Sequence, residues 1–270
     1  MRFKDKVVII TGATSGIGKA CAIAFGNEGA KIVITGRNET KLLEAEKELG
    51  NLKIDTLSVK ADVSIEADNV ELVNKVIIKY GKIDILINNA GISMRALFDD
   101  LDLKVIKQVM DINFWGAVYA TKYCLPHIKK TKGSIIGMSS IAGYRGLPAR
   151  TGYSASKFAL QGFLESLRTE LLKTSVHVLV ACPGFTASNI RNTALSADGG
   201  GQGESPRDEQ KMMTADEVAN YIMNATFKRK RDLVLTSQGK MTVFLNKWFP
   251  SFMDKMVYNH MAKEVDSPLK

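Results

Sequence analysis

The feature that most constrains the fold is a regular alternation of short apolar runs with longer segments of helical periodicity. The apolar runs are four to seven residues long and rich in valine and isoleucine, which is typical of strands buried on both faces of a parallel sheet. Strand, helix and strand repeated in this way predict an α/β fold with a doubly wound sheet. The expected strands are 7–10, 31–35, 54–60, 83–87, 133–138, 176–181 and 232–236, and the expected helices are 19–29, 39–48, 66–80, 105–127 and 154–172.

A glycine-rich loop, TGATSGIG at 11–18, follows the first predicted strand directly. A dinucleotide site needs a sharp turn, close approach of the backbone to a pyrophosphate, and a helix that begins with free N–H groups. Glycine allows the first two because it tolerates positive φ and has no Cβ. The loop predicts a Rossmann-type sheet in a single domain, with 1–238 as the dinucleotide-binding catalytic domain and 239–270 as a helical extension.

Five motifs occur in an order that resembles the short-chain dehydrogenase/reductase family, classical subgroup, over about residues 5–190. This resemblance implies an oxidoreductase that uses a nicotinamide cofactor and acts on CH–OH or C=O groups. The motifs are T-G-x-x-x-G-x-G at 11–18, NNAG at 88–91, Ser139-Ser140 at the end of the fifth strand, Y-x-x-x-K at 153–157 and Pro183-Gly184 after the sixth strand.

The end of the second predicted strand favours NADP(H) over NAD(H). NAD-preferring folds place an acidic residue there, which accepts hydrogen bonds from the ribose 2′-OH. Here Gly36 stands at that position, and Arg37 follows with a planar fork suited to a 2′-phosphate. Arg37 could alternatively be a solvated surface charge. Many NADP-using relatives also carry a basic residue inside the glycine loop, where this chain has only Thr14 and Ser15.

The resemblance implies further cofactor contacts along the same edge of the sheet. Asp62 and Val63 resemble an adenine-contacting pair, although an ordinary helix N-cap is an equal interpretation of Asp62. Residues 183–186 resemble the loop that receives the nicotinamide carboxamide, and Ser188 stands where the family usually has threonine. The complete predicted cofactor set is Gly12, Thr14, Ser15, Gly16, Ile17, Gly18, Arg37, Asp62, Val63, Asn89, Ala90, Gly91, Tyr153, Lys157, Pro183, Gly184 and Thr186.

Tyr153 and Lys157 lie four residues apart on a predicted helix and therefore on one face of it. A free tyrosine has a pKa of about 10, and a nearby ammonium is expected to lower it. The resemblance implies that Lys157 also holds the nicotinamide ribose and that Ser140 holds the substrate oxygen. It further implies that Asn113, the fourth catalytic residue, holds a water linked to Lys157. Ser139 competes with Ser140, but the spacing to Tyr153 favours Ser140.

These residues predict an NADP(H)-dependent interconversion of a carbonyl and a secondary alcohol by hydride transfer. A 3-oxoacyl thioester reductase is the alternative, and a non-catalytic NADP(H)-binding regulatory protein is the alternative of another class. The four intact catalytic residues argue against the latter. The loop at 196–208 is long enough to act as a lid. Mostly apolar residues are the candidate walls of the substrate pocket, which favours a hydrophobic substrate. Each of them could equally be ordinary core packing. They are Met94, Leu97, Tyr144, Leu147, Pro148 and Phe185.

The net charge of +9 allows an anionic cofactor, membrane surface or other polyanion as a partner. No nucleic-acid motif accompanies it, so a nucleic-acid partner is not expected. Three scattered cysteines and three scattered histidines form neither a disulfide framework nor a metal-ligand spacing. Without a signal sequence or an apolar stretch of ~20 residues, the chain is expected to be cytoplasmic.

The segment 239–263 interleaves aromatic residues and methionines with lysines, and Pro250 should divide it into two short helices. Two interpretations stay open. Residues 240–263 could make peripheral contact with an anionic membrane, or their apolar face could pack on the substrate pocket or on a second subunit. The resemblance implies a homodimer or homotetramer that forms through the helices near 105–127 and 154–172.

Overall fold

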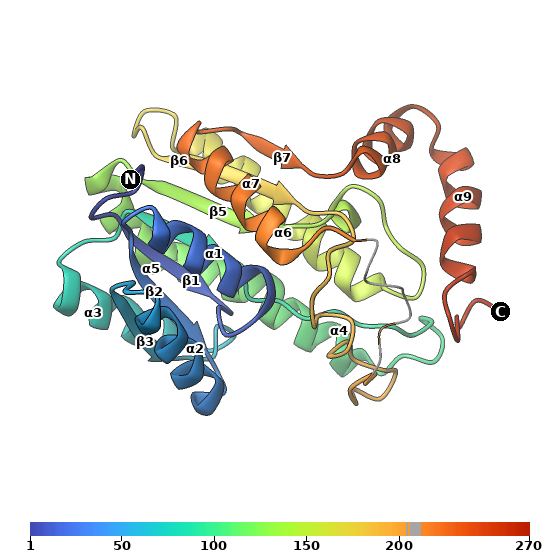
Figure 1. Ribbon diagram of the computed structural model, residues 1–270. Coiled ribbons are helices and arrows are strands. Elements are labelled where there is room, and N and C mark those ends of the chain that lie inside the picture. Colours follow the sequence, from blue (N-terminus) through green and yellow to red (C-terminus); the bar gives the residue numbers. More distant parts are fainter. Residues whose placement is uncertain (204, 206–211) are drawn as a thin grey trace.

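A seven-stranded parallel sheet forms the centre of the protein, with helices on both faces (Figure 1). The computed structural model describes residues 1–203, 205 and 212–270. The strand order is β3-β2-β1-β4-β5-β6-β7, which confirms the predicted Rossmann-type, doubly wound sheet in a single domain. The strands are β1 (Val7–Thr11), β2 (Lys31–Gly36), β3 (Thr56–Lys60), β4 (Ile85–Asn88), β5 (Ser134–Met138), β6 (His177–Cys182) and β7 (Asp232–Val234).

The apolar runs are continuous because the central strands pack on both sides. In β1, Val8 and Ile10 belong to the core on one face, and Val7 and Ile9 belong to the core on the other. This alternation is the two-residue period of a strand. The first core contains residues of α1 (Gly16–Asn27), α2 (Glu39–Asn51) and α7 (Ala215–Phe227), and the second contains residues of α3 (Glu66–Tyr80), α5 (Gly116–Thr131) and α6 (Thr151–Glu170).

The direction of winding reverses between β1 and β4, which are neighbours in the sheet. Ligands of doubly wound folds bind in the crevice outside the carboxyl ends of the strands at such a switch point. Because all strands are parallel, the loops after β1, β4, β5 and β6 emerge at the same edge. The glycine loop, the NNAG segment, Ser140 and the 183–186 loop therefore meet there, although they are far apart in the sequence.

Two helical predictions differ from the structure. The helix expected at 105–127 consists of α4 (Leu103–Met110), a π-helical stretch (Asp111–Trp115) and α5. Helix α7 was not predicted, although Thr214 and Glu217 form a capping box at its start. That signal was present in the sequence as T-x-x-E before an apolar run. The π-helical stretch has no comparable sequence signal, and such widened turns are frequent at functional sites.

The C-terminal extension forms α8 (Ser237–Trp248) and α9 (Pro250–Ala262), at one end of the molecule beyond β7 (Figure 1). Pro250 occupies the first turn of α9, so the predicted division into two short helices is confirmed. The division of the chain at residue 238 into a catalytic domain and an extension stays a prediction. In the described part of the chain, no helix is both long and apolar enough to cross a membrane.

Candidate active site

The loop between β1 and α1 turns at Gly12 and Gly16, whose φ angles are +64° and +55°. A Cβ on Gly12 would lie 2.8 Å from the Cα of Ala90, so this position needs glycine for space as well as for conformation. Ser15 is the N-cap of α1, but its side chain makes no capping hydrogen bond and the first turn carries no acidic residue. The start of α1 is thus suited to an anionic group such as a pyrophosphate.

The glycine loop is tied to the NNAG segment by a small hydrogen-bond network. The Thr11 hydroxyl accepts from the backbone N–H groups of Asn89 and Ala90, each at 3.0 Å. The Asn89 amide donates to the carbonyl oxygens of Thr11 and Gly12 at 2.9 and 3.0 Å. The predicted residues Asn89, Ala90 and Gly91 are therefore fixed beside the proposed phosphate site.

At the end of β2, Arg37 projects into solvent with 57% of its side chain exposed, and its Nη1 lies 3.7 Å from Oδ2 of Asp62. A Cβ on Gly36 would lie only 2.9 Å from Cγ2 of Thr14, so a carboxylate side chain has little room there. Asp62 does not cap α3, whose N-cap is Ile65. Its carboxylate instead accepts from the N–H and hydroxyl of Ser64 at 3.0 and 2.6 Å. The capping interpretation of Asp62 is therefore wrong.

The two serines after β5 have different surroundings. Ser139 is buried, and its hydroxyl accepts from Nε2 of Gln161 at 2.8 Å and donates to the carbonyl of Lys157 at 3.3 Å. Ser140 is half-buried, accepts from the Ala142 N–H at 3.1 Å and lies within hydrogen-bonding reach of the Tyr153 phenol. Ser139 thus anchors α6 to the sheet, and the Ser140 hydroxyl shares a site with Tyr153.

The electrostatics of Tyr153 differ from the sequence-based expectation. Burial raises the pKa of Tyr153, and the hydrogen bond with Ser140 and the charges of Arg150 and Arg191 only partly oppose this effect. The Lys157 Nζ lies 5.6 Å from the centroid of the Tyr153 ring. The predicted lowering of the phenol pKa by Lys157 does not occur in this arrangement, because removal from water outweighs the nearby charges. The phenol is kept protonated at neutral pH.

Lys157 is itself buried, and burial lowers its pKa to about 8. Its Nζ donates to the carbonyl oxygen of Met138 at 2.8 Å. A Cβ on Gly91 would lie 3.5 Å from the same Nζ, so the NNAG segment passes close to the ammonium. Lys157 therefore lies between the carboxyl ends of β4 and β5, and its pKa of about 8 is close to neutral pH.

Asn113 lies within the π-helical stretch and is buried. Its Oδ1 accepts from the Ile92 N–H at 2.8 Å, and its Nδ2 donates to the Ile92 carbonyl and to the Ser156 hydroxyl, both at 2.9 Å. Both amide hydrogens are thus used within the protein, and they hold the NNAG segment against α6. That Asn113 also holds a water beside Lys157 stays a prediction.

Comparison with known proteins agrees with this arrangement. Residues 6–198 match the family model for short chain dehydrogenases. The chain belongs to the short-chain dehydrogenase/reductase family. It is 35% identical over 97% of its length to the mouse protein named dehydrogenase/reductase SDR family member 7B, of which the alignment covers 83%. It is 33% identical over the same share to a Dictyostelium discoideum protein named dehydrogenase/reductase SDR family protein 7-like, covered to 84%.

Two solved structures have the same fold. One is a short chain dehydrogenase/reductase from Burkholderia phymatum in complex with NAD, with a TM-score of 0.84 and 23% identity over 93% of this chain and 96% of that one. The other is an alcohol dehydrogenase from the archaeon Thermococcus sibiricus complexed with 5-hydroxy-NADP, with a TM-score of 0.76 and 22% identity over 86% and 96%.

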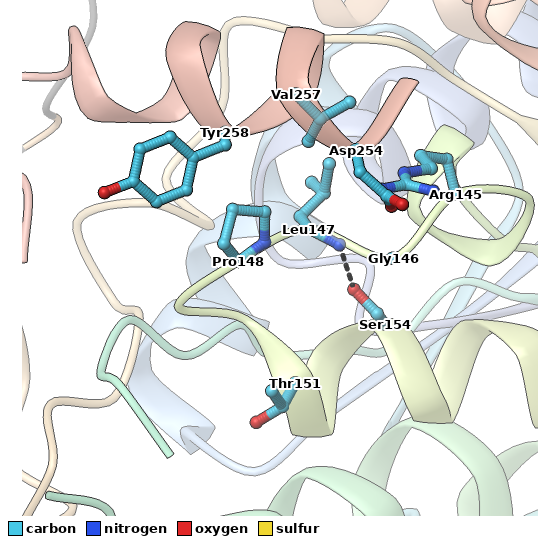
Figure 2. A pocket seen from close by; sticks show the side chains of 9 residues that line it. All are labelled: Arg145, Gly146, Leu147, Pro148, Thr151, Ser154, Asp254, Val257 and Tyr258. Carbon is cyan, nitrogen blue, oxygen red and sulfur yellow. Dashed lines mark hydrogen bonds and ion pairs between the residues drawn. The ribbon is translucent and has the colours of Figure 1, made fainter. Parts of the chain in front are cut away.

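The substrate side of this short-chain dehydrogenase/reductase is formed by segments distant in sequence. Met94 is fully buried in a cluster that contacts Tyr153, and the Phe185 ring lies 6.2 Å from that of His260 in α9. Leu147 and Pro148 face α9 and line a cavity of about 470 Å³ with Val257 and Tyr258 (Figure 2). Neither Ser140 nor Tyr153 is among the residues that line this cavity. This cavity is therefore separate from the Ser140–Tyr153 pair, and the role of Leu147 and Pro148 as substrate walls stays a prediction.

Ionic contacts that were not predicted hold the C-terminal extension on residues near the active site, including the segment between Ser140 and Tyr153. Glu264 is buried, and its Oε2 accepts from Arg150 at 2.8 Å and lies 3.6 Å from Nε of Arg95. Burial lowers the pKa of Arg95. Arg145 bonds to Asn246 at 3.1 Å. It also forms an ion pair with Asp254, and Figure 2 shows these two side chains close together. No local pattern could predict these pairs, because their members lie about a hundred residues or more apart.

Part of the predicted lid is packed against the site. Ala197 packs against the apolar cluster around Met94, and the N–H of Asp102 donates to the carbonyl of Ala197 at 3.0 Å. Residues 204 and 206–208 of the predicted loop lie outside the described residues. A lid function for 196–208 stays a prediction.

Proposed function

We propose that the protein is an NADP(H)-dependent oxidoreductase that interconverts a carbonyl and a secondary alcohol, on a hydrophobic substrate. The observation that carries the proposal is the meeting of Ser140, Tyr153 and Lys157 at the carboxyl edge of the sheet, beside a glycine loop suited to a pyrophosphate. A regulatory protein that only binds the cofactor would have no need for a partly buried phenol next to a hydroxyl and an ammonium.

The residues present fit a nicotinamide dinucleotide. The glycine loop and the start of α1 would hold the pyrophosphate, Asp62 and Val63 the adenine, Asn89 and Lys157 the nicotinamide ribose, and residues 183–186 the carboxamide. The side chain of Ser188 lies 3.6 Å from where a Cβ on Gly16 would be, so the loop after β6 reaches over the glycine loop. When bound, the cofactor supplies or accepts the hydride.

The protein's own residues handle the proton and the oxygen. The Ser140 hydroxyl accepts from the Ala142 N–H, which leaves its hydrogen to donate to a substrate carbonyl oxygen. The Tyr153 phenol, kept protonated by burial, donates its proton to that oxygen as the carbonyl is reduced. The Lys157 ammonium then stabilises the phenolate that remains. In the direction of oxidation, the same groups act in reverse order.

Preference for NADP(H) is supported by Arg37 and by the close packing of Gly36 on Thr14. We expect Arg37→Gln to raise KM for NADPH by roughly 10- to 100-fold, because a charge-assisted contact to the 2′-phosphate is lost. KM for NADH should change less than about twofold. Steady-state kinetics with both cofactors measures the two effects. Lys41→Gln, an exposed cation on α2, serves as the control. Equal losses with NADPH and NADH would contradict the proposed role of Arg37.

The reaction and the substrate class are tested together by NADPH oxidation with the purified protein. A short 3-oxoacyl thioester and a bulky hydrophobic ketone such as a steroid are assayed in parallel. Turnover of the bulky ketone alone is the expected result. Turnover of the thioester would favour the alternative 3-oxoacyl thioester reductase. Tight NADPH binding without turnover of any carbonyl from a broad panel would favour the non-catalytic regulatory protein and overturn the proposed activity.

We further propose a cytoplasmic homodimer or homotetramer, in peripheral contact with a membrane through residues 240–263. Exposed aromatic side chains on the outer faces of the π-helical stretch and α6 support self-association through these elements. Trp115 and Phe158 are both about half exposed, and the rings of Phe114 and Phe163 meet edge to face at 6.3 Å. Such aromatic surfaces are enriched at subunit interfaces. No nucleic-acid partner is proposed.

A further inference from the structure

The apolar residues of the C-terminal extension fall into two groups that point to different sides. Met253, Val257 and Met261 are buried and pack with Leu147, in the segment between Ser140 and Tyr153. This inner group stabilises the extension on the catalytic part of the protein. The second group stays exposed, with fractions between 37% and 61%, and we call it the docking face; it consists of Met241, Phe244, Trp248, Phe249, Phe252 and Met256.

The residues of the docking face follow the helical period on each helix, so they form a row on each one rather than scattered exposure. Met241, Phe244 and Trp248 are spaced by three and four residues along α8, which places them on one side of that helix. Phe252 and Met256 are four apart on α9. The two rows meet at the helix junction, where Trp248 is followed directly by Phe249. Figure 1 shows α8 and α9 at one end of the molecule, beyond the last strand of the sheet. Six exposed large apolar side chains gathered on two consecutive helices in this way point to an interaction site.

The charges around this face have one dominant sign. Residues 237–263 contain four lysines and one aspartate, which gives a formal charge of +4 − 1 = +3. The aspartate, Asp254, is already paired with Arg145. Lys240, Lys247 and Lys255 are exposed, and the Nζ of Lys247 lies 5.5 Å from the ring centroid of Trp248. Aromatic rings and cations thus alternate along each helix. A surface that complements them is apolar and carries negative charge at its border.

We infer that the docking face binds the surface of an anionic phospholipid bilayer, with its aromatic side chains at the level of the headgroups and its lysines against lipid phosphates and carboxylates. Interfacial helices have this composition, because aromatic rings suit the boundary between water and acyl chains and lysines are attracted by the negative surface potential. Both helices are too short to cross the bilayer, so the contact is peripheral. The contact does not depend on the reductase activity.

A partner protein or a second copy of the chain would cover the apolar residues but would not need the interleaved lysines. Like-charged faces of two copies would repel one another across a symmetric contact. The net positive charge therefore favours an anionic lipid surface over self-association at this face. Self-association through the docking face is the competing explanation, and the vesicle experiment distinguishes it from lipid binding.

The experiment is co-sedimentation of the full chain with vesicles of phosphatidylcholine, with and without phosphatidylserine. We expect binding to the phosphatidylserine vesicles that weakens as salt is raised. The combined variant Lys240→Gln, Lys247→Gln, Lys255→Gln should lower partition by roughly a hundredfold, since each lysine contributes about fivefold. The variant Phe244→Ser, Trp248→Ser, Phe252→Ser should lower it by at least about a hundredfold.

Matched controls lie on other surfaces of the same chain. Lys4→Gln, Lys41→Gln, Lys53→Gln removes the same charge from exposed sites, and Ile78→Ser, Leu172→Ser removes exposed apolar side chains from α3 and from the turn just after α6. Both controls should bind the vesicles as the unaltered chain does. Thermal unfolding of every variant reports whether the fold is intact, so a loss of binding in an intact variant can be assigned to the face.

Two outcomes would overturn the inference. The first is equal binding to vesicles with and without phosphatidylserine, or an equal loss in the matched controls. The second is absent vesicle binding together with a lower solution mass for the Phe244, Trp248, Phe252 variant, which would show that a second copy covers the face. Because the vesicle assay needs no turnover, its failure would leave the proposed reductase function untouched, and failure of the reductase assay would leave this inference untouched.

Discussion

Tyr153→Phe should abolish turnover almost completely, with a fall in kcat of roughly 10²- to 10⁴-fold. The variant lacks only the hydroxyl, so the ring still packs against the cluster around Met94. In the unaltered chain, burial keeps the phenol protonated, and Ser140 lies within hydrogen-bonding reach of it. The substituted enzyme has no proton to give to the oxygen that becomes negative as hydride arrives. Single-turnover measurement of NADPH oxidation with an accepted ketone checks this result.

A control separates a chemical defect from a folding defect. Tyr221→Phe removes a hydroxyl from an exposed tyrosine on α7 and should leave kcat unchanged. NADPH affinity, measured by fluorescence, should be retained in Tyr153→Phe to within a few-fold, because the ring remains in place. If Tyr153→Phe retained more than about a tenth of the original kcat, Tyr153 would not be the proton donor.

Lys157→Met should lower kcat/KM by roughly 10³-fold and weaken NADPH binding as well. Two functions are lost at once: the ammonium that stabilises the Tyr153 phenolate and the donor proposed to hold the cofactor ribose. The expected combination of a lower kcat and a higher KM for NADPH distinguishes this variant from Tyr153→Phe. Lys173→Met, an exposed lysine just after α6, is the matched control and should behave as the unaltered chain does.

The pH dependence follows from the same lysine. Burial lowers the pKa of Lys157 to about 8, from an ordinary value of 10.5. The charged form is therefore complete well below pH 8 and is lost as the pH rises through that value. We expect kcat/KM for carbonyl reduction to be level at lower pH and to fall as the pH rises above about 8. A profile that stays level to pH 10 would contradict the role given to the ammonium.

The lowered pKa also predicts how Lys157→Met affects stability. Because folding disfavours the charged form of Lys157, the buried charge opposes folding below about pH 8, and this opposition fades as the pH rises toward 10.5. Removing the charge should therefore not lower the thermal midpoint at neutral pH. A variant that is inactive but at least as stable as the unaltered chain would show that the loss is chemical.

Several elements could be predicted because their signals are local. Buried parallel strands carry continuous runs of valine and isoleucine, and the seven predicted strands lie within two residues of the observed bounds. The glycine loop could also be predicted, because a positive φ and the close approach of another backbone segment leave few possible residues at Gly12. Helix α7 was also predictable, because Thr214 and Glu217 have the spacing of a capping box.

Other features depend on groups that only the folded chain brings together. Asn113, in the π-helical stretch, bonds Ile92 and Ser156, which lie 21 and 43 residues away. The predicted lowering of the Tyr153 pKa was wrong, because the spacing to Lys157 does not indicate how far the phenol is removed from water. The Glu264 contacts with Arg150 and Arg95 join residues more than 110 positions apart.

The sequence by itself determined the strand and helix periodicities, the loops that join them and the family to which the chain belongs. These follow from side-chain alternation and from backbone geometry, which act over a few residues. The tertiary structure alone decided which way the pKa of Tyr153 moves, which residues pair with Glu264, and which side chains of α8 and α9 stay exposed. Each of these depends on burial, and burial is set by segments that approach one another only after the sheet has formed.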